Sequence, residues 1–215
     1  MTAPDEAEEL VQRYASRGDH QIRVYSLMGK ENLHALGRAA AAAGLRLVGK
    51  CPDALTFEEA MDAGMTCIDQ IHTVARGHLQ PGFKAPDRWD RFGVDVLELT
   101  GHHLDFEAIR RMARELAARQ VWNTPTLVWH DRISREPADN LRHPALGYMP
   151  RSSSAAWEAA FGRFAARSRS DIAVWRKAKQ AQARTLPIVV GILHQEGAPL
   201  LTGTDAAGPF TIPGF

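Results

Sequence analysis

Short apolar runs in this 215-residue chain end in side chains that can carry charge or bind a metal ion. In chain order these side chains are Arg23 with Tyr25, Lys50 with Cys51, Gln70 with His72, Thr124 to Thr126, and Asp205. Imidazole and carboxylate groups can ligate a divalent metal, whereas guanidinium and ammonium groups supply positive charge. If the runs are parallel strands, their carboxyl ends meet at one edge of a sheet, and such side chains can form a site there.

The elements that would position these side chains alternate between strand and helix patterns. Five apolar runs are predicted as strands, at residues 22–27, 45–49, 67–71, 121–129 and 199–204. A helix is predicted over residues 31–43, ending at Gly44, and a capping box at Thr56 and Glu59 predicts the start of another. The alternation predicts an α/β fold with a parallel sheet.

Later segments continue this pattern with interruptions. Apolar residues at helical spacing predict helices over 106–117 and 154–186, with Pro187 kinking or restarting the second. Residues 74–104 and 131–152 are predicted as irregular loops on the functional side, with a short strand at 94–97. Four tryptophans are predicted to be core or helix-packing residues rather than to form a stacking platform: Trp122, Trp129, Trp157 and Trp175.

Composition and charge exclude several classes of protein. The 26 basic and 25 acidic residues give a net charge of +1, so no basic excess favours nucleic acid as a partner. The acidic start is not typical of a signal peptide, and no apolar stretch is long enough to span a membrane. We therefore expect a cytoplasmic protein with neither a nucleic-acid nor a membrane partner.

The two cysteines are too few for a disulfide framework or a cysteine-built zinc site. Cys51 and Cys67 are expected to be reduced and packed. The alternative is a reactive Cys51, because the preceding Lys50 could lower its thiol pKa.

Four segments, in order and spanning nearly the whole chain, carry a resemblance to a known superfamily. They are HQIRVYSLMGKENLHALGRAAAAAGLRLVGKCP (20–52), LTFEEAMDAGMTCIDQIHT (55–73), VWNTPTLVWH (121–130) and GAPLLTGTDAAGPFTIPGF (197–215). Together they resemble the amidohydrolase superfamily, in the branch that holds imidazolonepropionase-like enzymes and metal-dependent Xaa-Pro dipeptidases. The resemblance implies a (β/α)8 barrel that binds zinc or another divalent metal and hydrolyses amide C–N bonds.

The resemblance also implies a ligand set that this chain mostly lacks. The fourth-strand lysine, which is carboxylated in the family, falls on Arg23; the fifth-strand histidine falls on Lys50, and the sixth-strand histidine on Gln70. The eighth-strand aspartate is kept as Asp205, which the resemblance makes the catalytic proton shuttle and, if any metal binds, a ligand. One carboxylate is not a zinc site, so the metal site is expected to be degenerate.

The match begins near the fourth strand, so the resemblance implies a partial barrel within one domain, residues 1–215. Five of eight strands cannot close a barrel and leave two sheet edges open. We therefore expect a homo-oligomer, a missing complementary barrel half, a fragment of a longer product, or an open α/β sheet.

Two arrangements could replace the missing ligands. His72 could reach the strand ends beside Asp205, together with a loop histidine, since residues two apart in a strand share a face; the loop histidines are His102, His103 and His130. Alternatively, Arg23 and Lys50 could balance the charge of Asp205 without metal. Lys50 could then also act as a base or imine former, or be a structural ion-pair partner.

Tyr148 matches a family position that contacts substrate, or else it covers the sheet as a loop aromatic. Arg23, Lys50, His72 and Tyr148 are thus the predicted substrate-binding residues. Three functions remain open: a metal-dependent amide hydrolase with a degenerate or rebuilt site, a metal-free relative that binds or transforms a small molecule, and a dimeric structural half-barrel.

Overall fold

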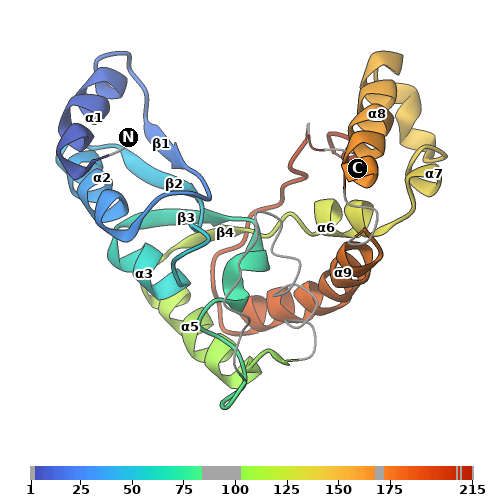
Figure 1. Cartoon of the computed structure of the whole chain (residues 1–215). Coiled ribbons are helices and arrows are strands. Elements are labelled where there is room, and N and C mark those ends of the chain that lie inside the picture. The colour runs from blue at the N-terminus through green and yellow to red at the C-terminus, as the bar shows by residue number, and fades with distance from the viewer. Residues whose placement is uncertain (1–2, 84–102, 168–171, 207, 209, 215) are drawn as a thin grey trace. The chain divides into compact units, whose positions relative to one another are not determined.

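The computed structural model describes residues 3–83, 103–167, 172–206, 208 and 210–214, and the strand predicted at 94–97 lies outside them. The chain divides into two compact units (Figure 1). Unit 1 comprises residues 1–78, 105–125 and 189–201; unit 2 comprises residues 79–104, 126–188 and 202–215. No helix among the described residues is both long and apolar enough to cross a membrane.

Unit 1 contains a four-stranded parallel sheet in the order β1-β2-β3-β4. The strands are β1 (Gln21–Val24), β2 (Arg46–Lys50), β3 (Met65–Asp69) and β4 (Trp122–Thr124). The predicted α/β class and parallel sheet are confirmed. The fifth predicted strand contributes one parallel bridge, between Asn123 and Leu200 beside β4.

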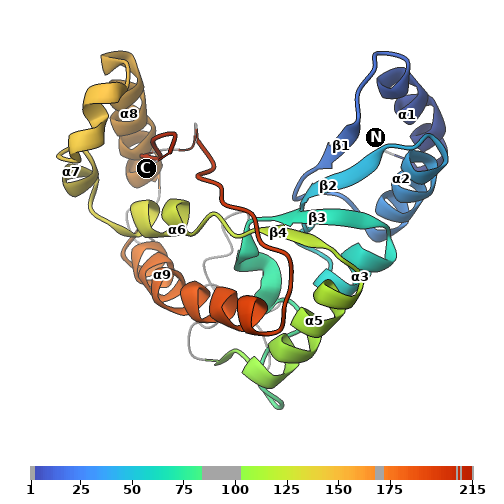
Figure 2. The same cartoon turned by 180° about the vertical axis from the view of Figure 1, so that it is seen from behind.

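Helices cover one face of this sheet (Figures 1 and 2). They are α1 (Ala7–Ala15), α2 (Lys30–Ala42), α3 (Phe57–Asp62) and α5 (Phe106–Ala118), with the short helices η1 (Pro4–Glu6) and η2 (Ile71–Ala75) in the connections. In β1 the burial alternates, with Ile22 and Val24 buried and Gln21 and Arg23 exposed. The buried side chains therefore point toward the helices, and the alternate ones occupy the opposite face.

The predicted capping box is present at the start of α3. The Glu59 backbone N–H donates to Thr56 Oγ1 at 3.2 Å, and the Thr56 backbone N–H donates to Glu59 Oε2 at 3.0 Å. This pairing satisfies two of the backbone donors that a helix leaves free at its first turn.

A glycine allows α2 to approach the end of α3 closely. A Cβ atom on Gly37 would lie 1.8 Å from the carbonyl oxygen of Ala63. Gly37 is buried in α2. The helical layer that covers the sheet therefore depends on the absence of a side chain at this position.

Unit 2 is helical over most of its described residues. It contains α6 (Leu127–Ser134), α7 (Pro137–Asn140), the short helix η3 (Pro144–Tyr148), α8 (Arg151–Arg167) and α9 (Ile172–Gln195), whose last turns belong to unit 1. Its apolar core gathers Ala145, Trp157, Phe210 and Ile212.

The structure corrects two sequence predictions in this part of the chain and excludes one of the two alternatives at Pro187. The strand predicted over 121–129 ends at Thr124, because Thr126 has a left-handed backbone (φ 51°) and α6 begins at Leu127. Residues 131–152 are largely helical rather than irregular, and α9 continues through Pro187 without a restart.

Candidate functional site

The carboxyl ends of the strands in unit 1 bring four polar side chains to the face opposite the helices. Lys50, Asp69 and Thr124 are direct neighbours in register across β2, β3 and β4. Arg23 of β1 is in register with Val48 of β2, which lies two residues before Lys50. The strand ends therefore present two cations and one carboxylate at the edge where α/β proteins place their sites.

The partner of Arg23 within unit 1 is Asp69. Both Nε and one terminal nitrogen of Arg23 contact Asp69 Oδ2, at 3.2 Å and 3.1 Å. The Arg23 side chain is 53% exposed and the Asp69 side chain 21% exposed. The resemblance implies a metal-ligating lysine at the position of Arg23. The guanidinium that is present there instead forms an ion pair with a carboxylate.

Sequence reasoning missed Asp69 because the third strand was predicted to run to residue 71. The strand ends at Asp69 instead, so its side chain, not that of Gln70, faces the open side at the strand end. The signal that could have found it is the strand period: Asp69 lies two residues after Cys67, on the same face.

Lys50 is enclosed by two other groups. Its side chain is 12% exposed, and Nζ lies 3.6 Å from Asp53 Oδ1 and 5.3 Å from the centre of the Tyr25 ring. The carboxylate and the aromatic face are both favourable neighbours for an ammonium group and hold it in place. These contacts favour the structural ion-pair alternative over the base or imine-forming lysine.

The chain leaves the extended conformation at Gln70, which corrects the geometric argument for His72. Gln70 is buried, has φ 60°, and donates its backbone N–H to the Thr124 carbonyl at 2.9 Å. His72 lies in η2 rather than two residues further along a strand, so strand alternation does not place it beside Gln70. Its role in substrate binding stays a prediction.

Asp205 and Tyr148 belong to unit 2. Asp205 has a left-handed backbone (φ 56°), and its carbonyl accepts hydrogen bonds from the Gly208 N–H at 2.8 Å and from Thr211 Oγ1 at 3.3 Å. Tyr148 is 79% exposed at the end of η3. The clustering of Asp205 with Arg23 and Lys50, and substrate contact by Tyr148, stay predictions.

The side chains that the structure describes form no recognisable cluster of metal ligands. Among the described residues, no group of three or more His, Cys, Asp and Glu side chains could hold one. Protein zinc sites supply three or four such ligands. At the strand ends of unit 1, Asp69 is engaged by Arg23, whose guanidinium cannot ligate a metal.

His103 and His130, two of the histidines considered for a rebuilt site, have aromatic neighbours in unit 2, and His130 lies in α6 rather than in a loop or at a strand end. His130 is fully buried, with its ring edge-on to that of Trp129 at 4.9 Å between centroids. His103 stacks on Phe83 at 4.1 Å. His102 lies outside the described residues. A rebuilt site with Asp205 stays a prediction for these histidines.

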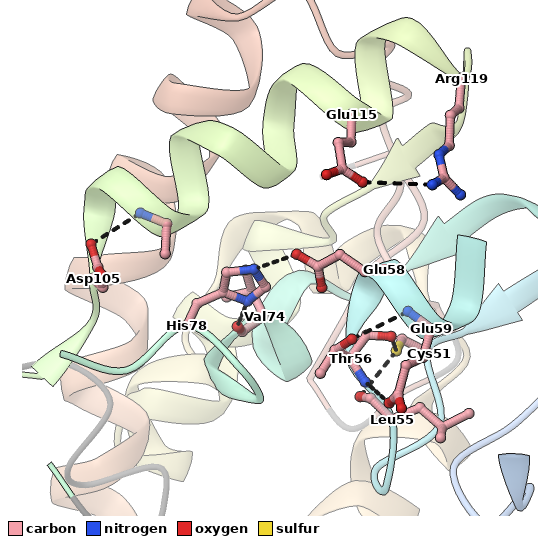
Figure 3. A network of polar contacts seen from close by, with 11 residues as sticks. Cys51, Leu55, Thr56, Glu58, Glu59, Val74, His78, Asp105, Glu115 and Arg119 are labelled. Carbon is pink, nitrogen blue, oxygen red and sulfur yellow. Dashed lines mark hydrogen bonds and ion pairs between the residues drawn. The ribbon is translucent and has the colours of Figure 1, made fainter. Parts of the chain in front are cut away.

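Cys51 is a packing residue, as expected. It is fully buried, and its Sγ lies 3.5 Å from the carbonyl oxygens of Leu55 and Thr56 (Figure 3). Burial raises the pKa of the thiol to about 12, so the reactive thiolate alternative is wrong.

A pair of a buried His78 and a partly exposed Glu58 joins α3 to the segment after η2 (Figure 3). His78 Nε2 lies 2.9 Å from Glu58 Oε1, and His78 Nδ1 lies 2.7 Å from the Val74 carbonyl. Burial alone would lower the pKa of His78, but the bond and charge of Glu58 outweigh it and raise that pKa. Burial would likewise raise the pKa of Glu58, and His78 lowers it instead. Both groups are thus stabilised in their charged forms.

A hollow of about 710 Å³ lies on the open face of the sheet. It is lined by Gln21, Arg23, Arg46, Val48, Thr66, Cys67, Asp69, Gln120, Trp122 and Leu201, all of unit 1. Trp122 is 44% exposed there, which corrects the prediction that it packs in a core, whereas Trp157 is buried as predicted. The lining mixes charged, amide and aromatic groups, as small-molecule sites do.

No protein-family model matches the chain, and no curated protein sequence matches it. Several solved structures are similar to the chain, three of them as follows. The structure of bottromycin amidohydrolase has a TM-score of 0.64 and 27% identity, over 98% of this chain and 42% of that protein. An uncharacterized protein has a TM-score of 0.51 and 13% identity, over 97% of this chain and 39% of its own.

The third structure is a Xaa-Pro dipeptidase with bound methionine in its active site, with a TM-score of 0.48 and 12% identity over 96% of this chain and 39% of that one. The chain thus spans about two fifths of the length of the structures it matches. An amidohydrolase is therefore among the structural neighbours of this α/β chain, namely bottromycin amidohydrolase at 27% identity.

Proposed function

We propose that this chain is an amidohydrolase-type protein that binds a small amide-containing molecule at the strand ends of its sheet, without a metal ion of its own. The observation that carries the proposal is the ion pair of Arg23 with Asp69 on a fold similar to an amidohydrolase. The pair places fixed charge at the strand end, where the resemblance implies a metal ligand. A guanidinium beside a carboxylate can hold both the carbonyl oxygen and the N–H of an amide.

Three observations support this arrangement. Arg23 is half exposed, so its remaining donors can face a ligand. The Lys50 ammonium lies over the Tyr25 ring, 5.3 Å from its centre, and adds a second cation at the strand ends. Asp69 has a second carboxylate oxygen, which lies 4.0 Å from Cys67 Sγ. Hydrogen bonds to these charged groups would fix the orientation of an amide.

Calorimetry with the full chain tests the proposal, using a panel of N-acyl dipeptides whose internal amide carries an N–H. Xaa-Pro dipeptides and lactones, which have no amide N–H, serve as comparison ligands. We expect binding that is unchanged by a chelator. Arg23→Ala is expected to weaken it at least tenfold, which corresponds to about 1.4 kcal/mol. The matched control is Arg17→Ala, which removes an exposed arginine paired with Asp19 in the same unit. Hydrolysis that disappears with a chelator would contradict the metal-free reading.

A second candidate function is amide hydrolysis by a larger assembly. It is favoured by the length comparison, because more than half of bottromycin amidohydrolase lies outside the match. Metal ligands contributed by another polypeptide would then complete the site. Hydrolysis that needs both added zinc and a second polypeptide would support this candidate over the first.

A further inference from the structure

The sheet face opposite the helices (Figure 2) carries a further cation and an aromatic ring on either side of Cys67. Cys67 of β3 is in register with Val48 of β2 and with Trp122 of β4. Arg46 lies two residues before Val48, and Arg46, Cys67 and Trp122 all line the hollow on this face. Adjacent strands of a sheet are about 4.8 Å apart. The cation and the ring therefore flank Cys67 from its two neighbouring strands.

Two charges of opposite sign act on Cys67. One oxygen of Asp69 lies 4.0 Å from its Sγ. Burial is the main cause that raises the pKa of the thiol, and the charges of Asp69 and Arg46 act on it in opposite directions. Arg46 forms no ion pair within the part of the chain that the structure describes, whereas Arg23 is paired with Asp69. The Arg46 guanidinium can therefore pair with an anion that enters the hollow.

The β4 side of the hollow is apolar. Trp122 is 44% exposed and Leu201 is 46% exposed, and both line the hollow. Val48, which also lines it, is 8% exposed. An exposed indole beside an exposed leucine can bury an aromatic side chain of a ligand.

We infer that the amide-containing ligand is an N-acyl amino acid with an aromatic side chain, the group that also ends a short peptide with an aromatic C-terminal residue. The inference rests on the proposed function, because it starts from an amide whose oxygen accepts from Arg23 and whose N–H donates to Asp69. The α-carboxylate then pairs with Arg46, and the aromatic ring packs against Trp122. One α-carbon carries the amide, the carboxylate and the side chain, so all three lie within about 5 Å of it, which is one strand spacing.

Calorimetry with the full chain and three matched ligands tests this inference. The ligands are N-acetylphenylalanine, its primary amide, which has no carboxylate, and N-acetylalanine, which has no ring. All three keep the acyl amide with its N–H. We expect N-acetylphenylalanine to bind at least tenfold more tightly than either of the others, because each of them loses one contact.

Two variants assign the contacts to side chains. Arg46→Gln is expected to bring N-acetylphenylalanine and its amide to the same affinity, and Trp122→Ala to do so for N-acetylphenylalanine and N-acetylalanine. The matched controls on the helical layer are Arg38→Gln in α2 and Phe106→Ala at the start of α5, which remove exposed side chains and should keep both differences. Circular dichroism verifies that each variant is folded.

The possible failures of the inference and of the proposed function can be told apart. Equal affinity for the three ligands, with binding that weakens on Arg23→Ala, would overturn this inference and leave the proposed function standing. The same holds if the chain binds N-acyl dipeptides but none of the three ligands up to about 10 mM. A preference for the carboxylate that survives Arg46→Gln would overturn the role of Arg46. A chain that binds no amide at all would overturn the proposed function, and this inference with it.

Discussion

The two faces of the β1–β4 sheet differ in what they contribute. The face toward the helices carries buried apolar side chains, among them Leu47, Met65 and Ile68. The opposite face carries Arg23, Asp69 and a half-exposed Trp122. Neighbouring residues of one strand therefore have different roles: alternate side chains stabilise the unit, and those between them form the exposed face on which we propose ligand binding.

The sharpest comparison of the two faces comes from adjacent residues in β2. Leu47→Ala is expected to lower the free energy of unfolding by about 3 kcal/mol, because Leu47 is 1% exposed and its truncation leaves a cavity. Arg46→Ala, on the open face, is expected to change it by less than about 0.5 kcal/mol. Urea titration of both variants measures this; equal losses would contradict the division between the faces.

The helical layer is expected to tolerate little change where it packs closely. Gly37→Ala should cost about 2 kcal/mol, because the added Cβ meets the Ala63 carbonyl and forces α2 from α3. Gly191→Ala is the control in α9, where a Cβ meets nothing within 4 Å. That change should be neutral or stabilise by up to about 1 kcal/mol. The urea midpoint should fall for Gly37→Ala and should stay the same or rise for Gly191→Ala.

The His78–Glu58 pair is expected to make the stability of unit 1 depend on pH. The pKa of His78 is raised above its ordinary 6.5, so its contribution is complete below pH 6.5 and is lost as the pH rises through the raised value. The pKa of Glu58 is lowered below its ordinary 4.5, so its contribution is complete above pH 4.5 and is lost as the pH falls through the lowered value. The pair should therefore stabilise most between pH 4.5 and 6.5.

Glu58→Gln is expected to cost about 1 kcal/mol near pH 5.5, a figure reduced by the partial exposure of Glu58, and less near pH 9. Unfolding at several pH values, with Glu8→Gln in α1 as the control, measures the difference. A loss that is the same at every pH would show that the pair acts only as a neutral hydrogen bond.

Only a small effect on stability is expected at the proposed site. Arg23→Ala and Asp69→Asn should each change the free energy of unfolding by no more than about 1 kcal/mol, because the pair is partly exposed and screened by water. Thermal unfolding measures this. A loss above about 3 kcal/mol would assign the pair to folding rather than to binding.

The sequence predicted elements more reliably than it predicted partners. Capping and periodicity are local, so the box at Thr56 and Glu59 and the helix over 106–117 could be identified directly. The end of β3 could not, because it depends on the left-handed backbone at Gln70, which an L-residue adopts only when its surroundings enforce it.

The candidate site was predictable in part for the same reason. Arg23 and Lys50 were placed correctly at strand ends, since strand alternation positions them. Their partners Asp69 and Asp53 were not predicted, because ion pairs depend on side-chain contacts that the strand pattern does not specify. Asp53 is only three residues from Lys50, but it lies in a loop where no periodicity applies.

Elemental analysis of the full chain, purified after expression with added zinc, tests the central claim most directly. With Arg23 and Asp69 paired at the strand ends, we predict well below about 0.1 equivalent of zinc, manganese, iron, cobalt or nickel per chain, because too few ligands converge there. One equivalent of a divalent metal that survives dialysis and is lost on Asp205→Ala would contradict the claim.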